Sequence, residues 1–272
     1  MQQRTILAIL ILLLVGGVAH GAVGARPWGM GGAYIAVADD AAAVYYNPAG
    51  LMSLQQRELV ISVGIPESKY DHPRFAAYVE PDSGLGAGGI SWVQRQEGET
   101  TSDAFVYSYA RTLAPRLTGG VNFRYERHKE GQRRGSNYSV DLAALYELTP
   151  HLQLGFLLQD FLATPIKLTG DAEEVPLEMN FRPGLAYRPY PGLQLAVDIY
   201  NLGGIFTEES SLRCGGEWTL GHLALRAGLE HQFRGENRWT AGFGYGRDGW
   251  EFNYAWVEGA SSIHHLGFAY RF

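Results

Sequence analysis

Charged side chains recur at alternate positions of several amphipathic segments, and they are the residues best placed to do chemistry. They carry both signs and comprise Arg124, Glu126, Asp141, Arg182, Asp198, Arg213, Glu217, Arg226, Glu230, Glu251 and Arg271. On one shared, enclosed face such groups could pair with one another, hold a packed segment or contact a polar ligand, and we favour pairing and holding. Their mixed signs also argue against a strongly ion-selective pore.

Motifs of the common catalytic chemistries are absent from the sequence. It contains no Gly-x-Ser-x-Gly elbow, no His-Glu-x-x-His pair and no phosphate-binding loop. His264 and His265 are adjacent, so on a strand they point to opposite faces, and we expect interface histidines near the outer rim rather than a metal site. Cys214 is the single Cys, and we expect an inert strand residue there. We predict no enzyme, no metal and no cofactor.

The overall composition restricts the class of protein. The 272 residues carry a net charge of −6 and no basic stripe, which argues against a nucleic-acid partner. Aromatic residues make up 12% and Gly contributes 35 residues, while charged residues are only 18%. Membrane-spanning barrels need aromatic girdles at both interfaces and small residues where the wall is crowded, so this composition favours such a barrel.

The start of the chain carries the features of an export signal. Arg4 precedes a short apolar run at 6–15, and small residues at 19–21 offer a cleavage point. We therefore interpret 1–21 as a secretory signal peptide. The apolar run is too short to cross a bilayer of about 30 Å, and no longer one follows it. We expect strands, rather than helices, to cross the membrane.

The end of the chain is an amphipathic strand. Leu266, Phe268, Tyr270 and Phe272 alternate with small or charged residues, so one face of this strand is apolar and the other is not. The ending resembles the terminal signal that the assembly machinery of outer-membrane barrels reads, with Phe268, Tyr270 and Phe272 as its residues. The resemblance implies a bacterial outer-membrane protein.

From residue 57 to residue 272 the chain divides into fourteen amphipathic segments, each close to the ~9–11 residues that a tilted membrane strand needs. These predicted strands are at about 57–65, 73–80, 85–94, 102–113, 116–127, 137–147, 151–159, 178–188, 192–201, 211–219, 222–233, 238–247, 250–257 and 263–272. We predict an all-β, antiparallel, transmembrane barrel with apolar side chains facing lipid. An exported β-sandwich is the alternative, but it would not need aromatic outer faces on nearly every strand.

The connections alternate in length. Tight turns are predicted at 113–116, 148–151, 189–192, 220–221 and 247–249. Longer polar loops are predicted between them, at 94–102, 128–136, 160–177 and 202–210. Outer-membrane barrels have short periplasmic turns and longer outer loops, so this rhythm predicts that both termini are periplasmic.

Residues 22–56 break the strand pattern and form a predicted hatch, or plug, inside the barrel lumen. Its candidate residues are Met30, Gly31, Gly32, Asp39, Asp40, Asn47, Pro48 and Gly50. We predict a short helix at 41–46, capped by one of the two Asp residues and ended by the Asn-Pro pair. A barrel of this size has a lumen that strand side chains alone do not fill. The alternative, a periplasmic tail, would leave several aromatic residues in water.

This N-terminal segment carries a family resemblance. Gly-Met-Gly-Gly-Ala, Ala-Asp-Asp-Ala-Ala-Ala and Asn-Pro-Ala-Gly-Leu resemble the hatch of FadL-type outer-membrane proteins, most closely the PorV/PorQ-type subgroup. The resemblance implies a fourteen-stranded barrel with Asn47, Pro48 and Gly50 as the hatch turn. For the superfamily it implies transport of fatty acids or aromatic hydrocarbons. For the subgroup it implies an accessory role in type IX secretion or surface attachment of other proteins.

Two local features favour passage of a hydrophobic molecule. Phe161, Leu162 and Ile166 form an apolar patch in the predicted outer loop at 160–177, and such patches commonly mark binding sites. Pro183 falls within a predicted strand, where a bulge could open a lateral gap in the wall. The patch could equally be a lid packed over the barrel mouth, and Pro183 could be a simple bend. The expected partners are outer-membrane lipid, the assembly machinery, a hydrophobic ligand and, for the alternative function, secretion-system proteins.

Overall fold

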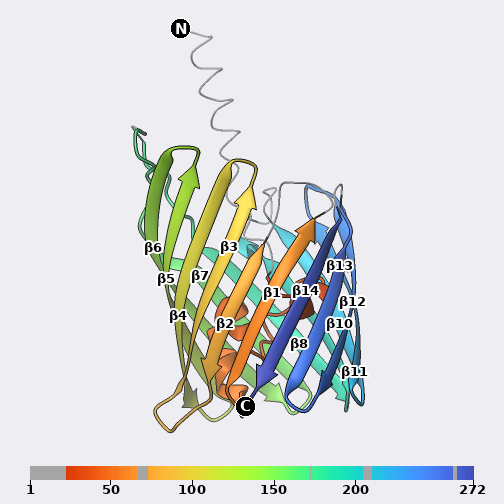
Figure 1. Cartoon of the computed structure of the whole chain (residues 1–272). Helices are drawn as coiled ribbons and strands as arrows, with labels where there is room; N and C mark the ends of the chain where they lie inside the picture. Colours follow the sequence, from red (N-terminus) through yellow and green to blue (C-terminus); the bar gives the residue numbers. More distant parts are fainter. Residues whose placement is uncertain (1–22, 67–72, 172, 205–209, 260–261) are drawn as a thin grey trace.

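The computed structural model describes residues 23–66, 73–171, 173–204, 210–259 and 262–272. In these residues fourteen antiparallel strands form one closed barrel, in which each strand pairs with its sequence neighbours and β1 closes the ring by pairing with β14 (Figure 1). The closing register runs from Glu58 opposite Arg271 to Pro66 opposite Ile263. The predicted strand number and antiparallel order are confirmed.

The strands differ in length. They are β1 (Glu58–Pro66), β2 (Arg74–Glu80), β3 (Ala87–Glu97), β4 (Thr100–Ala114), β5 (Leu117–Glu130), β6 (Arg133–Thr149), β7 (Leu152–Ala163), β8 (Asn180–Tyr190), β9 (Leu193–Tyr200), β10 (Ser211–Leu220), β11 (Leu223–Gln232), β12 (Asn237–Arg247), β13 (Trp250–Val257) and β14 (Ile263–Arg271).

Side chains alternate between the two faces of the wall, as the two-residue period of a strand requires. In β13, Trp250 and Phe252 are 49% and 41% exposed on the outer face, while Asn253 and Ala255 are buried on the inner face. Many charged and amide side chains are buried inside the barrel, whereas many Leu, Phe, Tyr and Trp side chains are exposed on its outside. The protein is thus apolar outside and polar inside, which suits a hydrocarbon surrounding.

One rim of the barrel, here named the turn rim, carries two-residue turns between β4–β5, β6–β7, β8–β9, β10–β11 and β12–β13. Left-handed backbone at Arg116 and Asp248 helps the chain to reverse within so few residues. The last residue lies at this same rim, where the Phe272 N–H donates to the Arg57 carbonyl at 3.0 Å (Figure 1). The five predicted tight turns agree with these positions.

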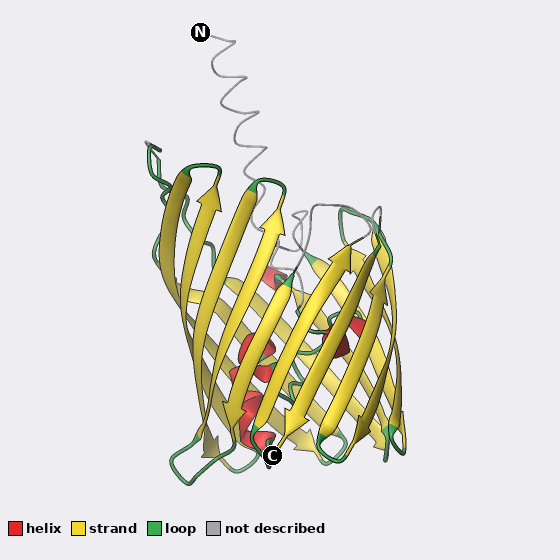
Figure 2. Ribbon diagram, in the orientation of Figure 1, coloured by secondary structure: helices red, strands yellow, loops and turns green. Residues whose placement is uncertain are grey.

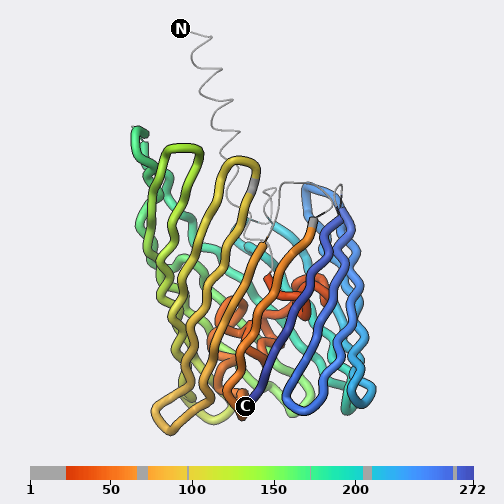
Figure 3. Tube along the Cα trace, in the orientation of Figure 1, coloured from red at the N-terminus to blue at the C-terminus, as the bar shows by residue number. Residues whose placement is uncertain are grey.

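The opposite rim, here named the hairpin rim, departs from the prediction. Loops predicted at 94–102 and 128–136 are strand hairpins: only residues 98–99 separate β3 from β4, and only residues 131–132 separate β5 from β6. These hairpins rise beyond the ends of β1 and β2 (Figure 3). Backbone pairing does not depend on side-chain polarity, so the ladder continues past the end of the apolar pattern that defined the prediction.

The described residues before β1, 23–57, lie inside the barrel and are here named the interior segment (Figure 2). It contains the short helices α2 (Ala25–Gly29) and α3 (Ala43–Tyr46) and the 3-10 helix η1 (Pro48–Ser53). A further 3-10 turn, η2 (Leu202–Gly204), follows β9. The helix α2 was not predicted. The residues predicted as a signal peptide, 1–21, lie outside the described residues.

The prediction for the start of α3 is wrong. Its N-cap residue is Ala42, which makes no side-chain cap, instead of Asp39 or Asp40. Asp40 Oδ1 does accept the Ala42 N–H at 2.9 Å, but both carboxylates also bind Arg26. Asp39 and Asp40 are therefore ion-pair partners of Arg26, instead of the N-cap residue that the sequence pattern predicted. Among the described residues, no helix is long and apolar enough to cross a bilayer.

Candidate functional site

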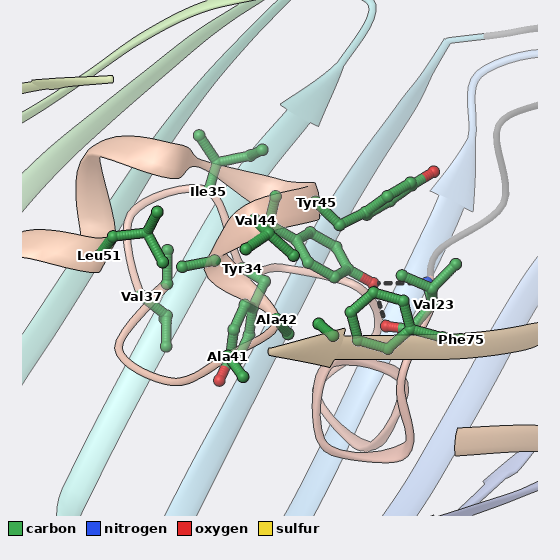
Figure 4. Packing of buried hydrophobic residues seen from close by; sticks show 14 of the residues in the cluster. Val23, Tyr34, Ile35, Val37, Ala41, Ala42, Val44, Tyr45, Leu51 and Phe75 are labelled. Atoms are coloured by element: carbon green, nitrogen blue, oxygen red, sulfur yellow. Dashed lines mark hydrogen bonds between the residues drawn. The ribbon is translucent and has the colours of Figure 1, made fainter. Parts of the chain in front are cut away.

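The interior segment is a packed structure rather than a loose tail. Met30, Tyr34, Tyr46 and Leu51 are fully buried. The Tyr46 hydroxyl donates to the Val23 carbonyl at 2.9 Å and accepts the Val23 N–H at 2.8 Å, which ties the start of the segment to α3. Figure 4 shows the surrounding apolar cluster, which draws on the interior segment and on the barrel wall.

Close approach to the wall depends on glycines in the strands. A Cβ at Gly215 or Gly228 would lie well within 3.0 Å of the backbone at residues 30–31, and real Cβ atoms essentially never come so close to other heavy atoms. Gly120 and Gly155 have the same relation to residues 48–49 and 35–36. Because glycine alone leaves this space, these four wall positions fit the path of the interior segment.

The two glycines after Met30 have a different role. Gly31 and Gly32 have left-handed φ values of +65° and +76°. The Gly31 N–H also donates to Thr240 Oγ1 of β12 at 3.0 Å. The Gly-Gly pair therefore turns the chain where it touches the wall, in a backbone conformation that residues with a side chain rarely adopt.

Arg26 of α2 links the segment to the wall through charge. Its guanidinium binds Glu217 of β10 with two bonds of 2.8 and 2.9 Å, and it lies 2.7 Å from Asp39 and 2.9 Å from Asp40. Arg226 of β11 binds the same Glu217 at 2.5 Å. Burial alone lowers the pKa of Arg26, but the charges of Asp39 and Glu217 hold that pKa well above its ordinary value. Arg26 was not among the predicted site residues.

Asp198 of β9 holds the middle of the segment. Its Oδ2 accepts the backbone N–H groups of Tyr34 at 2.5 Å and of Ile35 at 2.8 Å. The Tyr34 hydroxyl donates to Asp40 Oδ2 at 2.8 Å, and burial raises the pKa of this hydroxyl well above its ordinary value. One wall carboxylate thus satisfies two buried backbone donors that no element of secondary structure pairs.

The predicted hatch turn bridges the segment and β6. Asn47 Nδ2 donates to the Ile35 carbonyl at 2.8 Å and to the Ala144 carbonyl at 3.1 Å. Its Oδ1 accepts the Ala49 N–H at 3.1 Å, so Asn47 also caps η1, in which Pro48 is the first residue. Within the same turn, a Cβ at Gly50 would collide with the Ala38 carbonyl.

The predicted lumen charges face the interior, and those that form ion pairs lie in two groups, on β10 to β14 and on β5 to β7. Near the turn rim, Arg226, Glu251 and Arg271 extend the Arg26 network: Glu251 lies 3.6 Å from Arg226 and 2.8 Å from Arg271. Arg213 and Glu230 pair at 2.8 Å between β10 and β11. The second group lies on β5 to β7.

In that second group, Arg124 lies 2.6 Å from Asp141 and 3.3 Å from Asp160. The wall is irregular there, because Asp141 of β6 alone faces residues 159–161 of β7. Asp160 has a left-handed φ of +55°, and its N–H donates to Asp141 Oδ1 at 2.9 Å. The bulge therefore lies in β7, the strand next to Pro183, whereas at Pro183 itself the sequence had allowed either a bulge or a bend.

The wall is also interrupted beside Pro183. The β7–β8 register passes through Pro183, opposite Phe156, without a shift. The β8–β9 ladder, in contrast, ends toward the hairpin rim at Gly184 opposite Asp198, one residue after Pro183. Because proline has no N–H to donate, it suits the point at which a ladder stops. We name residues 180–183 and the β7 bulge at 159–161 the interrupted wall.

Arg182 lies on the inner face of the interrupted wall. Its guanidinium stacks over the Tyr200 ring at 4.0 Å, and Arg213 lies over the same ring at 4.5 Å. The Arg182 Nε donates to Asn180 Oδ1 at 3.1 Å, while its buried Nη2 has no hydrogen-bond partner in the described residues. Arg182 is thus the one predicted lumen cation without an ion pair in the described residues.

An apolar surface borders the interrupted wall. Phe161 and Leu162 are 44% and 62% exposed, and they belong to β7 rather than to the predicted loop. Ile166 follows in the connection and forms an isolated bridge with Val175, and Met179 is also exposed. The structure therefore brings the predicted patch and Pro183 to adjacent strands.

The connection after β7 follows the edge of β6. The Thr164 N–H donates to the Tyr138 carbonyl at 2.9 Å, and the Thr169 N–H donates to the Arg134 carbonyl at 2.8 Å. These bonds attach this part of the connection to β6, close to the hairpin rim.

The adjacent histidines are not both at an outer rim as we expected. His265 is buried in the lumen and stacks on Trp28 of α2 with ring centroids 5.3 Å apart. His264 points the other way and hydrogen-bonds the Tyr254 hydroxyl at 2.8 Å. The prediction for His265 is wrong because α2 packs against β14, and the local sequence pattern does not reveal this contact. Cys214 is a free, part-buried thiol.

Comparison with solved structures finds this fold in a hydrocarbon channel, a toluene transporter and a FadL homologue. The CymD monoaromatic hydrocarbon channel is 14% identical over 92% of this chain and 98% of that chain, with a TM-score of 0.69. The toluene transporter TbuX of Ralstonia pickettii is 13% identical over 92% and 98%, with a TM-score of 0.67. A Pseudomonas aeruginosa FadL homologue is 11% identical over 92% and 98%, with a TM-score of 0.68.

Sequence comparison gives a more limited result. A family model described as "Putative MetA-pathway of phenol degradation" matches residues 98–202, which is less than half of the chain. No curated protein matches the sequence. The structural comparison shows that the chain has the fold of FadL-type outer-membrane barrels.

Proposed function

We propose that this chain binds hydrophobic small molecules and transports them across the outer membrane, through a lumen that its N-terminal segment closes at rest. The proposal rests on one combined observation: the interior segment is docked in the lumen, and the barrel wall is interrupted. The segment occupies the direct route along the barrel axis, and the interruption at residues 180–183 lies beside an exposed apolar patch. A hydrophobic molecule therefore has a lateral route that a polar solute would not favour.

The fold comparisons support this class of ligand. CymD is named as a monoaromatic hydrocarbon channel, and TbuX and the Pseudomonas putida protein TodX are named as toluene transporters. The family model that matches the middle of the chain is described in terms of phenol degradation. We infer small aromatic hydrocarbons or fatty-acid-like molecules as ligands, and we propose no catalytic role.

The proposed orientation places the turn rim in the periplasm and the hairpin rim outside the cell. Short turns at the rim that holds the last residue, and longer strand hairpins at the other rim, support it. It requires removal of residues 1–21 and recognition of Phe268, Tyr270 and Phe272 by the assembly machinery, both of which remain predictions.

Uptake by whole cells tests the proposal, because an intact outer membrane slows hydrophobic molecules that cross a plain lipid bilayer freely. The chain is expressed in a host that lacks such channels, and accumulation of labelled toluene and labelled oleate is compared with that of the empty host. Expression should raise the initial rate for at least one of the two. Equal rates for both ligands would reject the proposal.

A matched pair of variants tests the lateral route. Leu162, beside the interrupted wall, and Leu113, near the turn rim, are 62% and 66% exposed on the outside of the barrel. Leu162→Gln should slow uptake severalfold, whereas Leu113→Gln should not, because only the first lies on the proposed path. If both variants behave alike while heat-modified gel migration shows folded barrels, the lateral route is wrong.

The accessory role in secretion is the alternative, and it rests on the resemblance of the N-terminal motif alone. It predicts a protein partner in the outer membrane. Native mass spectrometry of the detergent-purified chain distinguishes the two functions, since it detects bound subunits and bound small molecules in one measurement. A stoichiometric protein partner together with absence of uptake would favour the accessory role.

A further inference from the structure

The outer face of β3 to β6 carries aromatic side chains in lateral rows. Trp92 pairs with Phe105, Phe105 with Tyr125, and Tyr125 with Tyr138, so one row of four aromatic residues crosses four strands. The next row toward the turn rim contains Ile90, Tyr107 and Phe123, also in register. We name these seven residues the aromatic wall.

A shallow apolar groove lies on the aromatic wall. Its volume is about 620 Å³, and its lining includes all seven aromatic-wall residues together with Leu59 and Tyr78. Tyr107, Phe123 and Tyr138 are 52%, 51% and 61% exposed. A groove of this size on the lipid-facing side is suited to hydrocarbon chains rather than to a polar molecule.

Cations occupy the rows immediately beyond the aromatic wall, toward the hairpin rim. Arg127 of β5 follows Tyr125 by two residues, and Lys129 follows by two more. Lys129 lies directly opposite Arg134 of β6 in the strand register. All three side chains are on the outer face and exposed. We name Arg127, Lys129 and Arg134 the basic cluster.

The basic cluster lacks sufficient negative charge of its own. Arg127 Nη2 lies 3.7 Å from Asp103, but the other Asp103 oxygen already accepts from Trp92 at 3.0 Å and from Gln94 at 2.9 Å. In the described residues, neither Lys129 nor Arg134 forms a side-chain ion pair. Like charges directly opposite each other on adjacent strands are destabilising, so this pair calls for an external anion.

We propose that this face binds a phosphorylated lipid of the outer leaflet, with a headgroup phosphate on the basic cluster and acyl chains on the aromatic wall. Aromatic rings mark the boundary between hydrocarbon and headgroups, and the cations stand at the depth where lipid phosphates lie. Charge complementarity thus selects the headgroup, and the groove selects the chains. The inference uses the orientation proposed above and is independent of transport.

Native mass spectrometry of the full chain in detergent tests the inference. The probe is lipid A that bears two phosphates, compared with the same lipid after removal of its phosphates. Wild-type protein should retain the phosphorylated lipid about tenfold better. Equal retention of both lipids would overturn the proposal, and so would displacement of the phosphorylated lipid by inorganic phosphate at an equal concentration of phosphate groups.

Two sets of variants assign the effect to the cluster. The triple change Arg127→Gln, Lys129→Gln and Arg134→Gln should remove the preference for the phosphorylated lipid. The matched control changes three exposed arginines near the turn rim, Arg111, Arg116 and Arg247, to Gln. It alters the net charge equally and should leave the preference unchanged. Retention of the preference in the first set, or its loss in both, would contradict the proposal.

A single substitution gives a second readout that does not depend on loss of folding. Lys129→Glu places an acid opposite Arg134, so it should weaken retention of the phosphorylated lipid while raising the melting temperature of the lipid-free protein. A lower melting temperature, or unchanged lipid retention, would mean that Lys129 and Arg134 do not together form an anion-binding site. A chain that failed to transport but still bound the lipid would leave this inference intact.

Discussion

Gly228 of β11 lies so close to Gly31 of the interior segment that a Cβ at position 228 would fall well within 3.0 Å of the Gly31 amide nitrogen. The two glycines let two backbones approach without side chains between them. Gly31 also has a left-handed φ of +65°, so it is constrained by its own conformation as well as by the wall. Docking of the segment therefore depends on wall positions at which any side chain is excluded.

Gly228→Val should expel the interior segment from its seat while leaving the barrel closed. Overpacking a tight contact costs about 1–3 kcal/mol, and here the obstructing atoms belong to backbone that cannot rotate away. Chymotrypsin should then cut after Tyr34 or Tyr46, which are fully buried in the docked segment, in folded protein that heat-modified gel migration identifies. Gly246→Val on β12 is the control, because the nearest atom to a Cβ there is 3.6 Å away. Equal resistance of the two variants would contradict this account.

Arg26→Gln should weaken docking through charge. The substitution leaves Glu217, Asp39 and Asp40 without their shared guanidinium, and breaking a buried ion pair costs about 3–5 kcal/mol. We expect more frequent open events in single-channel recordings. Arg57→Gln is the matched control: Arg57 pairs with Glu80 at 3.4 Å, both side chains are more than half exposed, and such pairs contribute less than about 1 kcal/mol. Identical conductance traces for the two variants would argue against an electrostatic latch.

Asp198→Ala should release the middle of the segment. It removes the acceptor of the Tyr34 and Ile35 N–H groups, and each buried donor left unsatisfied costs about 1–3 kcal/mol. Hydrogen exchange at these two amides should accelerate by at least tenfold. Asp198→Asn keeps one carbonyl oxygen and should restore part of the protection. If Asn and Ala exchange equally fast, the charge of Asp198 matters more than its acceptor geometry.

Arg182→Met should behave differently from Arg26→Gln. Arg182 has a buried Nη2 without a hydrogen-bond partner and no ion pair in the described residues, so an apolar side chain of similar volume removes an incompletely compensated charge. The change in unfolding free energy should stay within about 1 kcal/mol. Thermal unfolding followed by gel migration measures it. A large loss of stability would show that the stacking of Arg182 on Tyr200 is a structural contact the barrel needs.

The strand pattern was readable because it is local. In β13 and β14, alternation of apolar and polar residues reports directly on two faces, and the tight turns carry their own Gly, Asp or Pro residues. The segments at 94–102 and 128–136 were wrongly predicted as loops because they are polar. Polar residues can still pair through their backbones in a β-ladder, and these do. Pro183 was correctly recognised as unusual, but the bulge appears at Asp160, whose conformation depends on its contact with Asp141.

The sequence by itself determined the class of the molecule: strands of alternating polarity, fourteen in number, that enclose polar side chains and present apolar ones. It also identified the segment before β1 as different from the wall. Only the tertiary structure decided the partners across the lumen, such as Arg26 with Glu217, Tyr34 with Asp198 and Trp28 with His265. The physical reason is range. Alternation is set by neighbours two residues apart, whereas these contacts join residues more than 150 positions apart, and only closure of the barrel brings them together.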